Sequence, residues 1–282
     1  MSTNWILFSH KARLVAGGHL INALDCDICS STIKGLSIRL LHVITHKAGL
    51  QQICGYVGNA YVNAYTNKKV FARAGPKFGQ LEGSIVIIAK ALYSLKTSSE
   101  RWHVHFSNSL RGLRFEPTRF DHNVWIRKNT NQGETDSYQY ICSYVDNFMI
   151  VAKDPIKIMC KIHGIYMVKS ICPPQYYLGN NYKKDKHGRW CIGCKKYINE
   201  AITRVKSIFG ALKKFDNPSE TGNHPELDNL AALDDTEHQK YQALIGMLVW
   251  IVTIGHLDIA HAMASLSRFT AHPHQGHVKH LL

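Results

Sequence analysis

Residues 141–153, ICSYVDNFMIVAK, constrain the fold of this chain more than any other segment. Two runs rich in β-branched, aromatic and aliphatic residues, 138–145 and 148–152, flank the dipeptide Asp146-Asn147. Because Asp and Asn tolerate the positive φ of tight turns, the pattern predicts a β-hairpin with this dipeptide in its turn. A carboxylate held between apolar strands suits Mg²⁺, although a turn that merely favours Asp and Asn has the same pattern.

The composition indicates a globular protein with anionic partners. The 282 residues are 45% hydrophobic, which is enough to bury the core of one large domain or two smaller ones. Lys and Arg number 34 against 20 Asp and Glu, for a formal charge of +14. Nucleic acid is the commonest partner of so basic a chain, but charge alone also fits a generic basic protein or an anionic membrane surface.

The N-terminus and the apolar segments predict an intracellular location, in cytoplasm or nucleus. The opening residues, MSTNWILFSHK, contain no signal peptide, and eight Cys are too few for a small disulfide scaffold, so reduced thiols are expected. The longest uncharged apolar stretch, 243–255, is shorter than the ~20 residues of a transmembrane segment. We therefore predict a buried helix there and no membrane partner.

The segment before residue 80 predicts one helix followed by strands. A helix is expected over 31–48, where Ile33, Leu36, Leu40 and Val43 recur at helical spacing. Short apolar runs broken by Gly, Asn and Pro over 53–79 predict a strand, a turn and a second strand.

The next segment, 84–112, predicts a buried strand at 85–88 and then a helix. Trp102, Phe106 and Leu110 follow one another at intervals of four, which places them on one helix face.

The rest of the chain predicts a second hairpin and a helical region. The hairpin spans 173–198, with its turn near 185–188. Helices are expected over 197–215, 236–253 and 258–269, and a polar segment rich in Pro and Gly separates the first two.

Eight short motifs, taken in order, resemble the reverse transcriptase of copia-type retrotransposons, and the resemblance covers nearly the whole chain. They are KARLVAGG at Lys11, GNAYVNA at Gly58, KALYSLKTSSERW at Lys90, YVDN at Tyr144, YLGN at Tyr177, KKYI at Lys195, YQALIGMLVW at Tyr241 and LDIAHAMASLSRF at Leu257.

The resemblance implies an α+β fold with right-hand polymerase architecture. An antiparallel sheet packed on helices would form palm and fingers over 1–190, and a helical thumb or connection region would follow over 191–282. The partners implied are RNA or an RNA/DNA hybrid, and no specific protein partner is predicted. In this family two Mg²⁺ ions, held chiefly by three aspartates, promote in-line attack of the primer on a nucleotide.

The chain departs from its family at two of these three aspartates. Tyr56 stands at the first position, and Asn147 stands at the second of the two positions in the hairpin. Only Asp146 remains. A neutral amide and a phenol with a pKa of about 10 are poor ligands for Mg²⁺, so metal binding is expected to be weak or absent. We predict a catalytically impaired reverse transcriptase, or alternatively a non-catalytic basic remnant that binds nucleic acid.

Two further basic residues match the family in its fingers. By resemblance, Lys11 and Arg13 contact the incoming triphosphate, although an exposed basic strand is an equally good interpretation of either residue. The chain also stops before any RNase H domain and starts close to the first motif, which resembles a truncated and decaying genomic copy.

Two residue clusters suggest metal sites and are better explained otherwise. A zinc site would need both CxxC pairs, Cys26 with Cys29 and Cys191 with Cys194, but they lie far apart in the chain, and reduced thiols are expected. The second cluster consists of four histidines near the C-terminus, which we interpret as a frayed end. They are His272, His274, His277 and His280.

Overall fold

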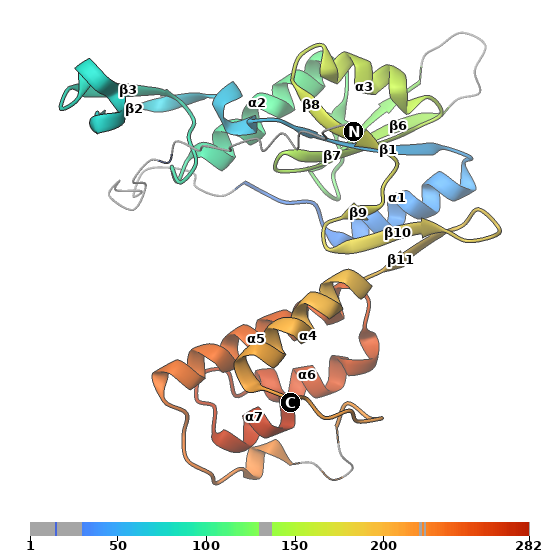
Figure 1. The fold of residues 1–282 in the computed structure, drawn as a ribbon. Coiled ribbons are helices and arrows are strands. Elements are labelled where there is room, and N and C mark those ends of the chain that lie inside the picture. Colours follow the sequence, from blue (N-terminus) through green and yellow to red (C-terminus); the bar gives the residue numbers. More distant parts are fainter. Residues whose placement is uncertain (1–14, 16–29, 130–136, 220–221, 223, 282) are drawn as a thin grey trace, which may run out of the picture. The chain divides into compact units, whose positions relative to one another are not determined.

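The computed structural model describes residues 15, 30–129, 137–219, 222 and 224–281 (Figure 1). The chain divides into two compact units, Met1–Pro173 and Pro174–Leu282. Both contain helices and antiparallel strands, a mixed architecture that is compatible with the predicted α+β class. Sequence analysis places the boundary of its two regions between residues 190 and 191, and the assignment of those regions to palm, fingers and thumb stays a prediction.

A six-stranded antiparallel sheet organises the first unit. Its strand order is β4-β5-β6-β7-β1-β8, so the earliest strand lies between two of the latest (Figure 1). The strands are β1 (Gln51–Val57), β4 (Glu116–Pro117), β5 (Val124–Lys128), β6 (Tyr138–Tyr144), β7 (Asn147–Ala152) and β8 (Val168–Cys172).

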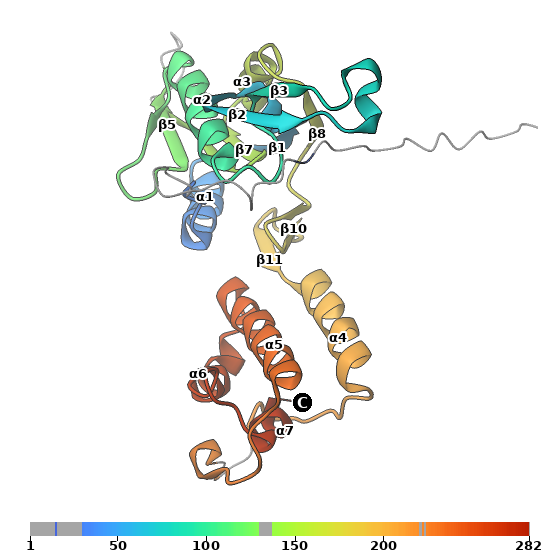
Figure 2. The ribbon, with the colours of Figure 1, turned by 90° about the vertical axis from the view of Figure 1, so that its left-hand side faces the viewer.

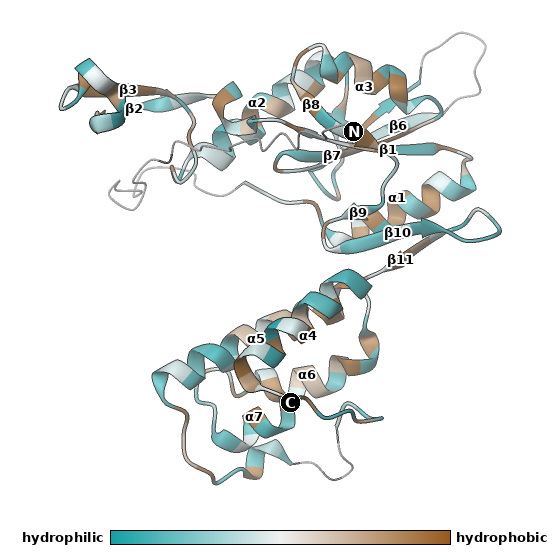
Figure 3. Ribbon diagram, viewed as in Figure 1, coloured by the Kyte–Doolittle hydropathy of each residue, from teal (hydrophilic) through white to brown (hydrophobic). Residues whose placement is uncertain are grey.

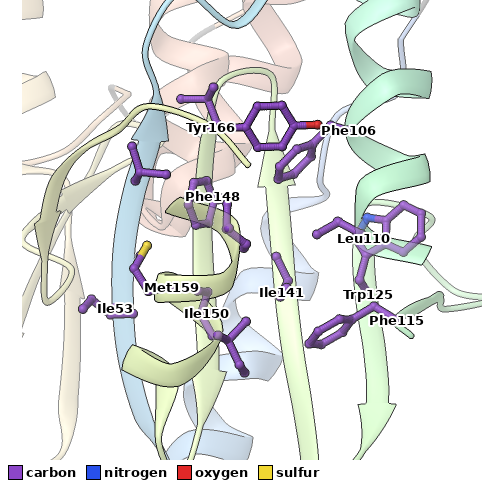
Figure 4. Packing of buried hydrophobic residues seen from close by; sticks show 14 of the residues in the cluster. Ile53, Phe106, Leu110, Phe115, Trp125, Ile141, Phe148, Ile150, Met159 and Tyr166 are labelled. Carbon is purple, nitrogen blue, oxygen red and sulfur yellow. The ribbon is translucent and has the colours of Figure 1, made fainter. Parts of the chain in front are cut away.

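Helices cover both faces of this sheet. On one face α2 (Ser98–Gly112) and α3 (Pro155–His163) pack against alternate strand residues such as Ile53, Phe148 and Ile150 (Figure 4). Figure 4 also shows Phe106 and Leu110 of α2 pointing into this core, as the sequence predicts. The colours of Figure 3 alternate along α3, as expected of a helix with one buried face.

The other face of the sheet carries α1 (Gly35–Lys47), which forms where sequence analysis predicts a helix. Its predicted apolar residues, however, point the wrong way, because Leu36, Leu40 and Val43 are all at least half exposed. The buried side carries Leu41, together with His42 and other residues between the predicted ones.

A two-stranded ribbon extends from the first unit (Figures 1 and 2). It consists of β2 (Tyr65–Arg73) and β3 (Ile85–Lys90). Sequence analysis predicts a buried strand at 85–88, but Ile85 is 71% exposed and Ile87 is also exposed, so this prediction is wrong. The apolar composition was misleading because, among the described residues, the ribbon has no third strand beside it and these side chains stay outside the core.

The second unit pairs a small sheet with four helices. The sheet order is β11-β10-β9, and β10 and β11 form the predicted hairpin around Asp185 and Gly188. Among its helices, α5 buries Tyr241 and Ile245 against Met263 and Leu266 of α6. The elements are β9 (Tyr176–Tyr177), β10 (Asn180–Lys184), β11 (Trp190–Gly193), α4 (Lys195–Phe209), α5 (Asp235–Ile254), α6 (Ala260–Ser267) and α7 (Gln275–Leu281).

The C-terminal histidines include one that is buried on a packed helix, which corrects the prediction of a frayed end. His277 lies on α7 and is only 3% exposed. Its Nε2 donates to the carbonyl oxygen of Pro225 at 2.9 Å, and its Nδ1 accepts from the backbone N–H of His274 at 2.9 Å. Its ring also stacks on Phe269 at 4.1 Å. These contacts attach α7 to the rest of the second unit.

Throughout the part of the chain that the structure describes, no helix has the length and apolar character needed to cross a membrane.

Candidate active site at the hairpin turn

The hairpin β6–β7 turns through two residues, and they are not the pair that the sequence suggests. Tyr144 pairs with Asn147, so Val145 and Asp146 form the turn and Asn147 is the first residue of β7. Val145 has φ 53°, a left-handed conformation that costs a β-branched residue about 1–3 kcal/mol. The turn therefore holds strain that its surroundings must support.

Two hydrogen bonds hold this turn in place. The indole Nε1–H of Trp102 donates to the carbonyl oxygen of Val145 at 2.7 Å. The backbone N–H of Val57 donates to the carbonyl oxygen of Asp146 at 2.8 Å. Since Trp102 is 1% exposed and stacks on Phe106 of α2, the turn is anchored to the hydrophobic core of the first unit.

The sheet brings Tyr56, Asp146 and Asn147 together. Tyr56 on β1 is the direct cross-strand partner of Asn147 on β7. Their neighbours Val57 and Phe148 point into the core with α2 and α3, so Tyr56 and Asn147 lie on the opposite face. All three residues of the predicted site are half-buried. Their proximity is what the family resemblance implies for the three aspartate positions.

The charges at this position do not favour a pair of Mg²⁺ ions. Asp146 is the carboxylate of the turn, and its Oδ1 accepts a hydrogen bond from the Asn147 amide at 3.0 Å. Tyr56 also has a cross-strand partner on β8, which is Lys169. This lysine adds a positive charge next to the site. Among the described residues, no group of three or more His, Cys, Asp or Glu side chains could hold a metal ion. The donor set therefore does not fit a two-metal centre.

Some of the other predicted site residues lie outside the described part of the chain. They are Lys11 and Arg13, and the first pair of zinc-site candidates, Cys26 and Cys29. The second pair is described, with Cys191 on β11 and Cys194 immediately before α4. Both are free thiols, and burial raises the pKa of Cys194.

Sequence reasoning missed two residues that shape the site. Trp102 is predicted as a core residue, but nothing in its spacing indicates a hydrogen bond to the turn. Lys169 lies in a strand that no periodic pattern marks, and its place beside Tyr56 depends on an irregular register between β1 and β8. Both contacts depend on the packing of segments that are distant in sequence.

Comparison with known proteins establishes the family. The sequence profile of the reverse transcriptase (RNA-dependent DNA polymerase) family matches residues 4–210, well over half of the chain. This chain is a copia-type reverse transcriptase domain. It is 24% identical to the retrovirus-related Pol polyprotein from transposon TNT 1-94 of Nicotiana tabacum, over 96% of its own length.

The domain corresponds to a small part of that relative. It spans 21% of the length of the tobacco polyprotein. No solved structure matches it.

Proposed function

We propose that this reverse transcriptase domain keeps the architecture of a polymerase without the capacity to synthesise DNA. The observation that carries the proposal is the pairing of Tyr56 with Asn147 beside a single carboxylate, Asp146. The six-stranded sheet would be the palm, the β2–β3 ribbon part of the fingers, and the helical second unit the thumb or connection region.

The physical argument rests on charge. Three aspartates would supply three negative charges to two dications, whereas this chain supplies one, and Lys169 lies beside Tyr56. Mg²⁺ demands charged oxygen ligands in tight octahedral geometry and releases its water reluctantly. A tyrosine and an asparagine do not offer Mg²⁺ the anionic oxygen pair of a carboxylate, so they cannot compensate for the missing aspartates.

Primer extension tests the proposal. On an RNA template with Mg²⁺ or Mn²⁺, the wild-type chain should extend no primer, and Asp146→Asn should change nothing. The proposal fails if the wild type synthesises DNA and Asp146→Asn abolishes that synthesis. Binding of an RNA/DNA hybrid, measured in the same samples, shows whether the protein is folded and retains nucleic-acid affinity.

Metal binding provides a readout that does not depend on activity. The variant Tyr56→Asp/Asn147→Asp should bind Mn²⁺ more tightly than the wild type in a direct titration, because it restores both carboxylates. Tyr56→Asn/Asn147→Gln is the matched neutral control and should resemble the wild type. Equal Mn²⁺ affinity of all three proteins would show that the missing carboxylates do not limit metal binding.

Nucleic-acid binding without chemistry is the second candidate, favoured by the formal charge of +14. Affinity for the hybrid should then fall steeply with added salt, because phosphate contacts release counterions. Undetectable hybrid binding at low salt would exclude this function.

A further inference from the structure

A concave surface lies at the end of the first unit's sheet that is remote from the hairpin turn. Its cavity volume is about 1010 Å³. It is lined by the start of β6, by the end of β5, by the residues that follow β7, and by one side of α3. Because β6 rises about 3.3 Å per residue over its seven residues, this surface is roughly 20 Å from the turn.

The charge of this surface, which we name the basic groove, is strongly positive. Two acidic side chains, Glu116 and Asp154, lie among its lining residues, and Asp154 is already bound to Lys157 at 3.4 Å. Six basic side chains outnumber them. They are Arg114, Arg127, Lys128, Lys153, Lys157 and Lys161.

One guanidinium in the groove is held rigidly. Arg127 donates from Nε to the Gln139 side chain at 2.6 Å and from Nη1 to the carbonyl oxygen of Leu113 at 2.6 Å. It also lies 4.4 Å over the ring of Phe115. Burial and the nearby charge of Arg114 lower the pKa of Arg127. The two cations repel one another, and an anion between them would relieve that repulsion.

The groove also presents apolar surface beside its cations. Tyr138 is 51% exposed and Ile156 is 50% exposed, and both belong to its lining. Exposed aromatic rings among basic side chains suit single-stranded nucleic acid, because unpaired bases stack on the ring while the cations contact phosphates. A duplex presents phosphates but leaves no base free to stack.

We propose that the basic groove is a second nucleic-acid site, which binds single-stranded RNA or DNA through phosphate contacts and stacking on Tyr138. This site is separate from the hairpin turn, and it does not depend on whether the domain polymerises. Its chemistry would hold the single-stranded part of a template, or another strand, at the opposite end of the sheet.

Charge removal in the full-length chain tests the site. The salt dependence is the slope of log K against log salt concentration, where K is the association constant for oligouridylate. Arg114→Gln/Lys161→Gln should reduce the magnitude of this slope by about 1.4, because two phosphate contacts are lost. The control Lys213→Gln/Lys214→Gln removes the same charge from exposed residues outside the groove lining and should leave the slope unchanged. Equal effects of the two variants would overturn the proposal and indicate general electrostatic attraction.

Protection of a thiol locates the ligand independently. Cys160 is exposed on the groove wall, while Cys172 of β8 lies outside it. With oligouridylate at ten times its Kd, maleimide labelling of Cys160 should slow about tenfold while Cys172 is unaffected. Protection should persist when saturating RNA/DNA hybrid occupies the rest of the domain. If polyglutamate of equal charge protects Cys160 as well, or if the hybrid removes the protection, the groove is not a separate nucleic-acid site.

Discussion

Val145 takes a backbone conformation that β-branched residues rarely adopt, and it does so at the tip of the candidate active site. Its carbonyl oxygen accepts a hydrogen bond from the indole of Trp102. The strained turn is therefore attached to a core side chain. The same residue that puts strain into the turn therefore fixes where Asp146 points.

Glycine at this position should relieve the strain. We expect Val145→Gly to raise the free energy of unfolding by about 0.5–1 kcal/mol, since glycine adopts positive φ without steric cost. Val70→Gly, in the extended conformation of β2, is the control and should lower stability by about 1 kcal/mol. Urea denaturation measures both values. A loss of stability in Val145→Gly would mean that side-chain contacts outweigh the strain.

His42 gives the first unit a dependence on pH. It is buried on α1, and burial lowers its pKa from 6.5 to about 4, against a smaller opposite effect of the nearby Gln52 side chain. The unfolded chain takes up this proton near pH 6.5 and the folded chain only near pH 4. Protonation therefore favours unfolding, and stability should fall as pH drops through this window.

The size of this effect can be isolated with one variant. Between pH 7 and pH 5 the wild type should lose about 2 kcal/mol more unfolding free energy than His42→Leu, at 1.36 kcal/mol per pKa unit. Because His42→Leu keeps all the other histidines, their contribution to the pH dependence cancels in the difference between the two proteins. Parallel stability curves for the two proteins, measured by urea denaturation at each pH, would show that His42 is protonated as easily in the folded state as in the unfolded chain.

At the scale of elements, periodicity predicted where helices form better than which face they bury. Helix α1 is present, yet Leu36, Leu40 and Val43 are exposed because the sheet receives the side that carries Leu41 and His42. Apolar residues occur on both sides of this helix, so its own sequence cannot select one. Helix α2 has a single aromatic side, and there the predicted residues are the buried ones.

Two neighbouring leucines on α1 test this assignment. Leu41 is 2% exposed, so Leu41→Ala should lower the free energy of unfolding by about 2–4 kcal/mol. Leu40→Ala should change it by less than about 0.5 kcal/mol. Both substitutions alter helix propensity equally, so the difference reports packing alone. Thermal unfolding of the two variants is the measurement, and equal losses would mean that the outer side of α1 is also covered.

For the whole molecule, the order of motifs identified the family and much of the element order, and the matched profile agrees with it. The sequence predicts the candidate site as a set of residues, because the motif resemblance assigns Tyr56, Asp146 and Asn147 to the three aspartate positions, and this assignment stays a prediction. Its surroundings were not, since Lys169 and the basic groove depend on strand register and on elements far apart in sequence. Composition gave the sign of the charge but not where it is concentrated.

The place of β1 in the sheet has a consequence for synthesis on the ribosome. Strand β1 ends at Val57, and its neighbours β7 and β8 end at Ala152 and Cys172. At about 5–20 residues per second, roughly 5–20 s pass between translation of β1 and of β7. During that interval β1 has neither of its sheet partners, and such non-local pairing is slow to form. We therefore expect both edges of β1 to stay open to pairing with other chains until β7 and β8 have been made.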